Sequence, residues 1–446
     1  MADSGFSYSL DDVKQMSNDV LNIAKNLGAS AAEAEVSLSI GQSVSVRLSE
    51  IENIEYNRDK GMSVTVYFGQ QKGHASTSDL SPQAIKDTVT AACNIAKYTA
   101  KDEFCGLADA SLMAKDVIDL DLYHPWDISV DDAVILAKEC EAAALAVDAR
   151  ITNSEGASVS SGSGCFSYSN SHGFTGGYYT SRQGISCSVI AESGDNMQRS
   201  YWYSTARAAA DLESAKAIGQ KTGERTVRRL NTKKIKTSQV PVIFEAPIAS
   251  GLISSLISAI SGGSLYRKSS FLLDSLGKQV ASPLLNIYED PHLRKGLASS
   301  PFDNEGVATQ PRQLVKDGVL QGYVLGNYSA RKLGMQTTGN AGGNHNLIVQ
   351  SGTQDLPSLL KQMGTGLLVT DLLGSGINMV TGDYSRGAAG FWVENGVIAH
   401  AVEEITIASN MADMLKMIVA IGNDICIQGS KQVGSILIER MTVASE

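Results

Sequence analysis

The chain has 446 residues, of which 37 are Lys or Arg and 47 are Asp or Glu, so its formal net charge is −10. This length exceeds what one hydrophobic core usually serves, and we expect two or three domains. The acidic balance opposes a phosphate backbone and argues against a nucleic-acid partner.

The six cysteines are spread along the chain without a Cys-x-x-Cys pair, which argues against a thiolate zinc site or a redox pair. They are typical of small buried residues in a reducing compartment. The first residues lack the basic and apolar regions of a secretory signal. The most apolar stretch, 366–373, contains Asp371 and falls short of the ~20 residues that span a bilayer. We therefore expect a cytoplasmic protein with no membrane contact.

The start of the chain predicts a helix followed by antiparallel strands. Ser9 and Asp12 resemble a capping box, and apolar residues at spacings of three and four continue to Gly28, which indicates an amphipathic helix. Apolar and polar residues then alternate over 36–48 and 62–68, as in half-buried strands.

The next segments add helices and a strand meander. The Ser-Pro pair at 81–82 opens a second helix, and an alanine-rich third helix runs over about 129–147. Short Ser, Gly and aromatic segments over 150–203 indicate strands joined by tight turns. A fourth helix is expected near 212–230. Helices on one face of an antiparallel sheet make an α+β domain.

A basic run at 233–238 precedes a fresh apolar strand at 240–244, which is typical of a linker between domains. We expect an N-terminal α+β domain at 1–236, with segments 1–125 and 126–236, and a C-terminal peptidase-like domain at 239–446.

The C-terminal part begins with a helix that has one apolar stripe and one serine stripe and ends at the Gly pair at 262–263. Beyond it, the Asp-Gly pair at 317–318 and the Asn-Gly pair at 395–396 mark hairpins between strands. We expect a second α+β domain with helices and a bent or barrel-like sheet.

Motifs for common chemistry are missing from the sequence. There is no phosphate-binding Gly-x-x-x-x-Gly-Lys-[Ser/Thr] and no Gly-x-Ser-x-Gly elbow. The pair Asp303 and Glu305 is expected to cap a strand or to face solvent. No two histidines lie within a helical turn of each other, so no local imidazole pair can chelate zinc. The histidines are His74, His124, His172, His292, His345 and His400.

Two glycine-rich segments contain candidate substrate-binding residues. His345 follows a run of glycines and asparagines, which lets backbone approach a ligand but is also common in exposed loops. Asp383, Tyr384 and Arg386 lie among the glycines of 382–390, and a loop of this kind can line a cleft and pair an extended peptide. A plain structural turn is the alternative.

Several segments together resemble the PmbA/TldD family, once labelled modulators of DNA gyrase and understood as peptidases, and the detail is similar to its PmbA (TldE) branch. The resemblance implies an N-terminal α+β domain, a C-terminal domain with a closed or bent sheet, and assembly with a TldD-type chain around an enclosed cavity. The similar segments are 39–79, 170–181, 262–274, 301–307, 328–334 and 382–396.

The resemblance also implies which residues the chain lacks. In the catalytic branch, the first helix of the C-terminal domain carries His-Glu-x-x-x-His, and a cysteine near the C-terminus is the third zinc ligand. The corresponding positions here are Ser255, Leu256 and Ile260, and the cysteine position falls near Ile421 rather than at Cys426. Serine, leucine and isoleucine supply neither imidazole nor general base. We therefore expect no catalytic and no metal-binding residue in this chain, and zinc in a TldD-type partner.

Three functions stay open at this stage. The first is a non-catalytic PmbA/TldE-type subunit that closes the chamber of a TldD-type zinc peptidase, helps to admit unfolded or extended peptides in proteolysis and peptide maturation, and forms a homodimer when alone. The second is a metallopeptidase in its own right, with zinc held by distant residues such as His345, Asp383 and Cys426. The third is a regulator of DNA gyrase, which only the older family label favours.

Overall fold

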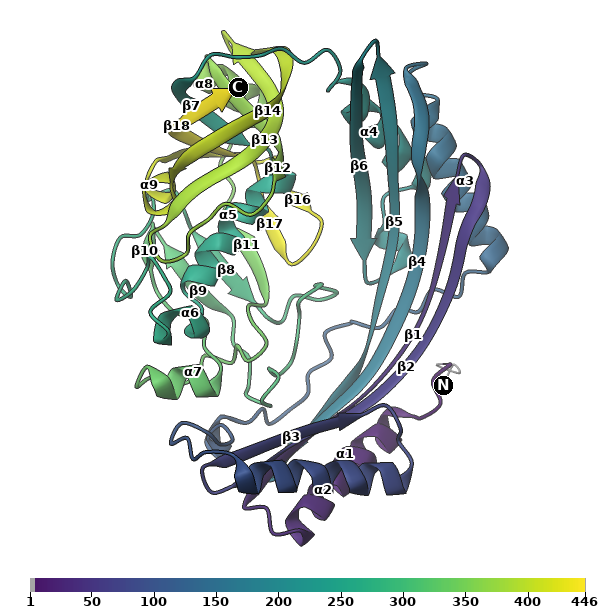
Figure 1. Ribbon diagram of the computed structural model, residues 1–446, viewed down its shortest axis with the longest axis vertical. Coiled ribbons are helices and arrows are strands. Elements are labelled where there is room, and N and C mark those ends of the chain that lie inside the picture. The colour runs from purple at the N-terminus through teal and green to yellow at the C-terminus, as the bar shows by residue number, and fades with distance from the viewer. Residues whose placement is uncertain (1–4, 446) are drawn as a thin grey trace.

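A long, curved antiparallel sheet forms one side of the molecule in the computed structural model, which describes residues 5–445 (Figure 1). Residues 1–4, part of the start examined for a secretory signal, lie outside the described residues. The strand order is β3-β2-β1-β4-β5-β6, and neighbouring strands are antiparallel. The strands are β1 (Ala31–Arg47), β2 (Glu50–Phe68), β3 (Gln71–Thr77), β4 (Ile151–Asn170), β5 (Thr175–Ser193) and β6 (Asn196–Ala206).

Helices cover the face of this sheet that is turned away from the C-terminal part (Figure 1). The predicted capping box is present, because Ser9 and Asp12 each accept a hydrogen bond from the other's backbone N–H. None of the helices within residues 5–445 combines the length and the apolar character needed to span a bilayer. The helices are α1 (Leu10–Asn26), α2 (Pro82–Tyr98), α3 (Val130–Leu145) and α4 (Ala215–Val227), with short 3-10 turns at Ala110–Leu112 and Ala209–Asp211.

The prediction of strands joined by tight turns over 150–203 is confirmed, and two of these strands are long, because β4 has 20 residues and β5 has 19. Glycines inside these strands permit close packing. A Cβ on Gly177 would lie 2.5 Å from the Phe166 carbonyl oxygen, and one on Gly176 would lie 2.6 Å from the ring of Phe302. Small residues therefore occupy strand positions where a neighbouring chain segment leaves no room.

The C-terminal part contains a closed barrel of five strands with helices, which confirms the α+β class with a barrel-like sheet. The barrel closes because β14 pairs with both β13 and β18. A sixth strand, β15 (Ile418–Ile421), extends the sheet from β18. The barrel strands are β7 (Ser238–Phe244), β12 (Gly366–Leu373), β13 (Asp383–Glu394), β14 (Val397–Asn410) and β18 (Ile436–Ser445).

A second, smaller sheet and several short helices complete this part. The sheet order is β10-β9-β8-β11-β17-β16. Its strands are β8 (Ile287–Asp290), β9 (Arg312–Lys316), β10 (Val319–Leu320), β11 (Asn346–Val349), β16 (Cys426–Ile427) and β17 (Lys431–Val433). The helices are α5 (Ala246–Ala259), α6 (Gly262–Tyr266), α7 (Asn327–Lys332), α8 (Leu356–Met363) and α9 (Met411–Lys416).

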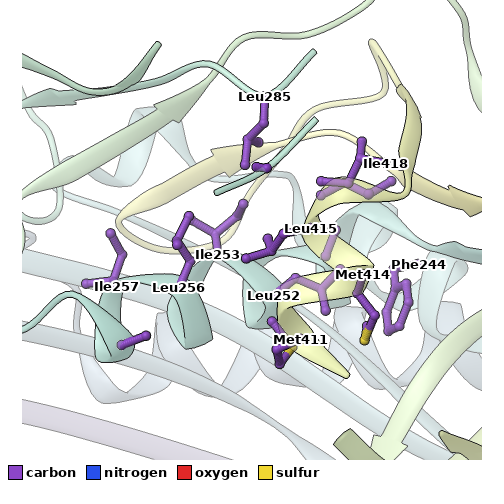
Figure 2. Packing of buried hydrophobic residues seen from close by; sticks show 14 of the residues in the cluster. Phe244, Leu252, Ile253, Leu256, Ile257, Leu285, Met411, Met414, Leu415 and Ile418 are labelled. Atoms are coloured by element: carbon purple, nitrogen blue, oxygen red, sulfur yellow. The ribbon is translucent and has the colours of Figure 1, made fainter. Parts of the chain in front are cut away.

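The core of the C-terminal part lies against α5. The apolar stripe of this helix packs with Phe244 at the end of β7 and with Met414 of α9 (Figure 2). Burial of each large apolar side chain contributes ~1.5–3 kcal/mol relative to exposure. The stripe consists of Leu252, Ile253, Leu256, Ile257 and Ile260.

At the end far from the barrel, the C-terminal part is fastened to a segment that follows α2. The Arg331 guanidinium donates to the carbonyl oxygens of Cys105 at 3.2 Å and Leu107 at 2.6 Å. The Tyr328 hydroxyl donates to the Asp102 carboxylate at 2.7 Å. These bonds to backbone and carboxylate oxygens fix α7 on the N-terminal part.

The acidic pair at 303 and 305 belongs to this same junction and does not face solvent as one expectation held. Asp303 is 2% exposed and accepts hydrogen bonds from the backbone N–H groups of Glu305, Val307 and Ala341. Burial raises the pKa of Glu305 to about 7, and the nearby carboxylates of Asp303 and Glu33 add to the rise. At a pH between 4.5 and about 7, the folded protein therefore retains a proton on Glu305 that the unfolded chain releases.

We predict that Glu305 lowers stability as the pH rises from 4.5, the ordinary pKa of its carboxyl, to about 7, because the folded state binds the proton more tightly over this window. Glu305→Gln should remove this dependence and raise the free energy of unfolding at about pH 8 by on the order of 1–3 kcal/mol. Urea unfolding at about pH 5 and about pH 8 measures both effects. Glu139→Gln, exposed on α3, is the control. An unaltered pH profile in Glu305→Gln would contradict the assignment.

Candidate functional site

A cavity of about 580 Å³ lies where the upper ends of the two parts meet. Its walls come from α4 and the edge strand β6 on one side and from α5, β12 and β13 on the other (Figure 1). Of the substrate-binding residues predicted from the sequence, Arg386 lines this cavity.

Arginines from the end of α4 form one wall. Arg225 and Arg228 donate to opposite oxygens of the Glu245 carboxylate, at 2.9 Å and 3.0 Å. Arg229 pairs with Asp371 of β12 at 2.7 Å. Spacings of three and four residues place these arginines on one side of the helix end. The same ion pairs that join α4 to the C-terminal part therefore shape the cavity.

Glu245 is 7% exposed and directly precedes α5. Burial acts to raise the pKa of this carboxyl, but the charges of Arg225 and Arg228 outweigh burial and hold the pKa below its ordinary value. Glu245 is thus an anion between two cations. Removing either arginine would leave the buried negative charge of Glu245 poorly compensated.

The edge strand β6 supplies an aromatic wall. Alternation along the strand turns Arg199, Tyr201 and Tyr203 toward the C-terminal part, while Trp202 packs into the core beneath α3 and α4. The Tyr201 and Tyr203 rings stack with centroids 6.3 Å apart. The Gln428 amide donates to the Tyr203 carbonyl oxygen at 3.0 Å, which closes the lower end of this wall.

Helix α5 presents hydroxyl groups that its own backbone already binds. Ser254 donates to the Ser250 carbonyl at 2.9 Å, and Ser255 donates to the Gly251 carbonyl at 2.9 Å. The other two positions compared with the zinc motif, Leu256 and Ile260, are fully buried in the core. Only Ser255 of the three lies on the less buried side of the helix.

The segment 382–390 is not a loop, and that prediction is wrong. It belongs to strand β13, in which Asp383 is exposed and Tyr384 is 2% exposed, with its ring 6.5 Å from that of Phe244. The glycines again reflect close packing, since a Cβ on Gly390 would lie 2.0 Å from the Leu368 carbonyl oxygen. Tyr384 is therefore part of the barrel core and does not form an open wall. Burial raises its pKa to about 12, and the Arg386 charge opposes the rise.

His345 lies elsewhere, in a buried polar network. Its backbone N–H and its Nδ1 contact one Glu289 oxygen at 2.8 Å and 3.3 Å, and Arg312 Nε donates to the other at 2.7 Å. Burial acts to raise the pKa of Glu289, but the bond with His345 and the Arg312 charge hold it at about 2. His345 does not line the cavity that contains Arg386. A substrate contact for His345 or Asp383 stays a prediction.

Sequence reasoning missed Arg225, Arg229, Tyr201 and Tyr203. The arginine spacing at the end of the fourth helix was a usable signal, because it predicts one basic helix side next to the linker. The partner carboxylates, Glu245 and Asp371, come from distant segments, and no local pattern connects them to α4.

Comparison with known proteins agrees with this architecture. Sequence models of the PmbA/TldA metallopeptidase match domain 1 at 32–96, the central domain at 123–230 and the C-terminal domain at 237–445. "Metalloprotease PmbA homolog" of Haemophilus influenzae is 52% identical over 434 residues, covering 97% of this chain and 96% of that protein. "Metalloprotease PmbA" of Escherichia coli O157:H7 is 51% identical over 415 residues, covering 93% and 92%. A solved Bacteroides thetaiotaomicron structure, named as a modulator of DNA gyrase, has a TM-score of 0.93 at 30% identity, covering 98% of this chain and 99% of that one.

Metallopeptidase-family models thus match both the curved sheet and the closed barrel, along most of the chain. The chain belongs to the PmbA/TldA metallopeptidase family, which confirms the resemblance to the PmbA/TldD family.

The name metalloprotease implies a metal, and the donor set of this chain does not fit one. The α5 positions offer hydroxyls bound by their own helix and buried apolar groups. Within residues 5–445, no group of three His, Cys, Asp or Glu side chains is placed to hold a metal ion. The proposed ligand set of His345, Asp383 and Cys426 is therefore wrong, because the fold keeps His345 in the Glu289 network and Asp383 at the exposed start of β13.

We predict that Tyr384 contributes strongly to stability and that Arg386 contributes little. Tyr384→Ala should lower the free energy of unfolding by ~3–5 kcal/mol, because it empties a filled core position. Tyr384→Phe should change it by less than ~1 kcal/mol, since the buried hydroxyl interacts with the Arg386 side chain but makes no hydrogen bond of good geometry among the described residues. Arg386→Ala should change stability by less than ~1 kcal/mol. Denaturant unfolding measures all three, and a fully stable Tyr384→Ala would contradict the core assignment.

Proposed function

We propose that this chain is the PmbA/TldE-type partner subunit of a two-chain zinc peptidase in the cytoplasm. A TldD-type chain holds the zinc, and this chain closes the chamber and helps to admit extended peptides for proteolysis or peptide maturation. The observation that carries the proposal is helix α5, which presents serines and buried aliphatic residues at the positions that the family resemblance assigns to the zinc motif.

The cavity beside α5 supports a role in peptide handling. Its volume of about 580 Å³ is that of a ligand pocket, and an edge strand forms part of its wall. Edge strands bind extended peptides through main-chain hydrogen bonds, and side-chain pockets beside them add selectivity. We also propose the division into domains at 1–236 and 239–446, because the cavity is lined by residues of both ranges.

An exposed edge on the other side of the sheet supports assembly with a second chain. Strand β3 pairs only with residues 62–68 of β2, so the first half of β2 is a sheet edge. Ile51, Ile54 and Tyr56 are 50%, 41% and 68% exposed on this edge. Unpaired strand edges with apolar side chains are templates for pairing with another chain. In the proposed function this edge serves contact with the TldD-type subunit, or with a second copy when that subunit is missing.

The test compares peptide cleavage by the TldD-type chain alone, with the wild-type partner, and with the Ser255→Ala partner. Omission of this chain should reduce turnover far more than tenfold, because substrate alignment alone is worth ~7 kcal/mol or more. Ser255→Ala should change turnover by less than tenfold, or under ~1.4 kcal/mol of barrier, because the hydroxyl only binds its own helix backbone.

Adding purified wild-type chain back to the lone TldD-type chain is the control and should restore turnover. Full activity of the lone TldD-type chain would refute the partner role. A Ser255→Ala effect as large as omission would instead make α5 part of the catalytic machinery.

A further inference from the structure

The cavity beside α5 contains more positive charge than the protein neutralises there. Its lining includes Arg199, Arg225, Arg229 and Arg386 but only one carboxylate, that of Asp371, which pairs with Arg229. Arg199 pairs with Glu155, which lies outside the lining. Arg225 shares the single Glu245 carboxylate with Arg228. Among residues 5–445, Arg386 forms no ion pair, and its Nη2 donates to the Gly374 carbonyl at 2.6 Å. In a chain with net charge −10, this local excess of cations is not a reflection of composition.

Two donors at this site are buried without a partner. The Nε atoms of Arg225 and Arg386 have no acceptor within hydrogen-bond geometry among the described residues, although the Arg386 side chain also interacts with the buried Tyr384 hydroxyl. A buried donor left unbonded costs about 1–3 kcal/mol, and more when it is charged, so native structures rarely retain one without a reason. Both donors belong to residues that line the same cavity. A ligand with anionic oxygens in the cavity would compensate the positive charge that the protein leaves over.

The adjacent strand indicates that such a ligand is extended. β6 is the last strand of its sheet, and the Tyr203 carbonyl accepts from the Gln428 side chain outside that sheet. Main-chain groups in an antiparallel strand alternate in direction, so those of Tyr201 and Arg199 point outward as well. Both residues line the cavity. An extended peptide can therefore pair with β6 while one of its groups reaches the guanidiniums.

We propose that this cavity binds a carboxylate of an extended peptide, with Arg386 and Arg225 as its donors, so that this chain favours peptides that carry an acidic group at that position. Guanidinium groups bind carboxylates through paired, charge-assisted hydrogen bonds, which makes the contact selective as well as strong. The peptide part of this inference rests on the proposed function. The acidic group is a side chain or the C-terminal carboxylate, two sources of the same chemistry.

Calorimetric titration of the full-length chain with three unlabelled peptides tests the proposal. One peptide has a single Glu and an amidated C-terminus, the second has Gln in its place, and the third has Gln with a free C-terminus. At least one carboxylate peptide should bind ten times more tightly than the neutral one, and added salt should weaken that binding. Whichever of the two carboxylate peptides binds more tightly shows whether the cavity prefers a side-chain carboxylate or the C-terminal carboxylate. Equal affinity for all three would overturn the proposal.

Two variants locate the effect and have opposite signs. Arg386→Gln should weaken binding of the preferred carboxylate peptide at least tenfold. Asp371→Asn should tighten it, because it removes the one carboxylate that lines the cavity and would repel the ligand. Arg294→Gln, whose side chain is 69% exposed outside the cavity, is the matched control for a lost positive charge and should leave the affinity unchanged. Thermal unfolding of each variant checks the fold.

The same loss in Arg294→Gln as in Arg386→Gln would also overturn the proposal, since it would reveal a general charge effect. These titrations use this chain alone and measure no cleavage. Failure of the carboxylate preference therefore leaves the partner function standing, and failure of the partner function in the cleavage test leaves the measured preference intact.

Discussion

The buried ion pairs of Glu245 are the interaction on which the arrangement of this molecule depends. Glu245 is the last residue before α5, and it binds two arginines from the end of α4. One carboxylate therefore connects α4, which packs on the N-terminal sheet, to α5, around which the C-terminal core packs. Because the side chains of Glu245 and Arg225 are only 9% and 12% exposed, removing either of them would cost several kcal/mol rather than the small amount typical of a surface pair.

The geometry of the cavity follows from this contact. With the end of α4 tied to Glu245 at the start of α5, the edge strand β6 faces the C-terminal part, and residues of β6, α5 and the first half of β13 line one cavity (Figure 1). One carboxylate shared between two arginines leaves positive charge over, and Arg386 adds more. The constraint that fixes the two parts thus also makes the space between them basic. The α5 serines do not compete for a ligand, because their hydroxyls bind the preceding turn of the helix.

Much of the fold could be predicted from local patterns. The capping residues gave the helix starts at Ser9, Ser81 and Ser129, because those side chains bond the backbone within three residues. Glycine was the main source of error, since the same residue permits a turn and permits two strands to pack tightly. In β13 the second cause operates at Gly390, and a strand was therefore taken for a loop.

The site was harder to predict because its contacts join distant segments. Arg386 was predicted as a binding residue from the residues next to it in the sequence. The other charged groups around the cavity come from α4 and from Glu245, which are far away in the sequence. His345 and Tyr384 were named from the same kind of local pattern and are held in a buried network and in the barrel core. Local composition indicated which segments contain candidate binding residues. Only the packing of the folded chain shows which of these residues lie in the core and which line the cavity.

The central claim is that this chain works without a metal of its own. Elemental analysis of the chain, purified without chelators and dialysed, tests it most directly when a TldD-type chain and the mixed complex are measured alongside. The account predicts no stoichiometric transition metal in this chain and about one zinc per pair in the complex, all of it contributed by the partner. Zinc at about one per chain that persists through dialysis of this chain alone would contradict the account.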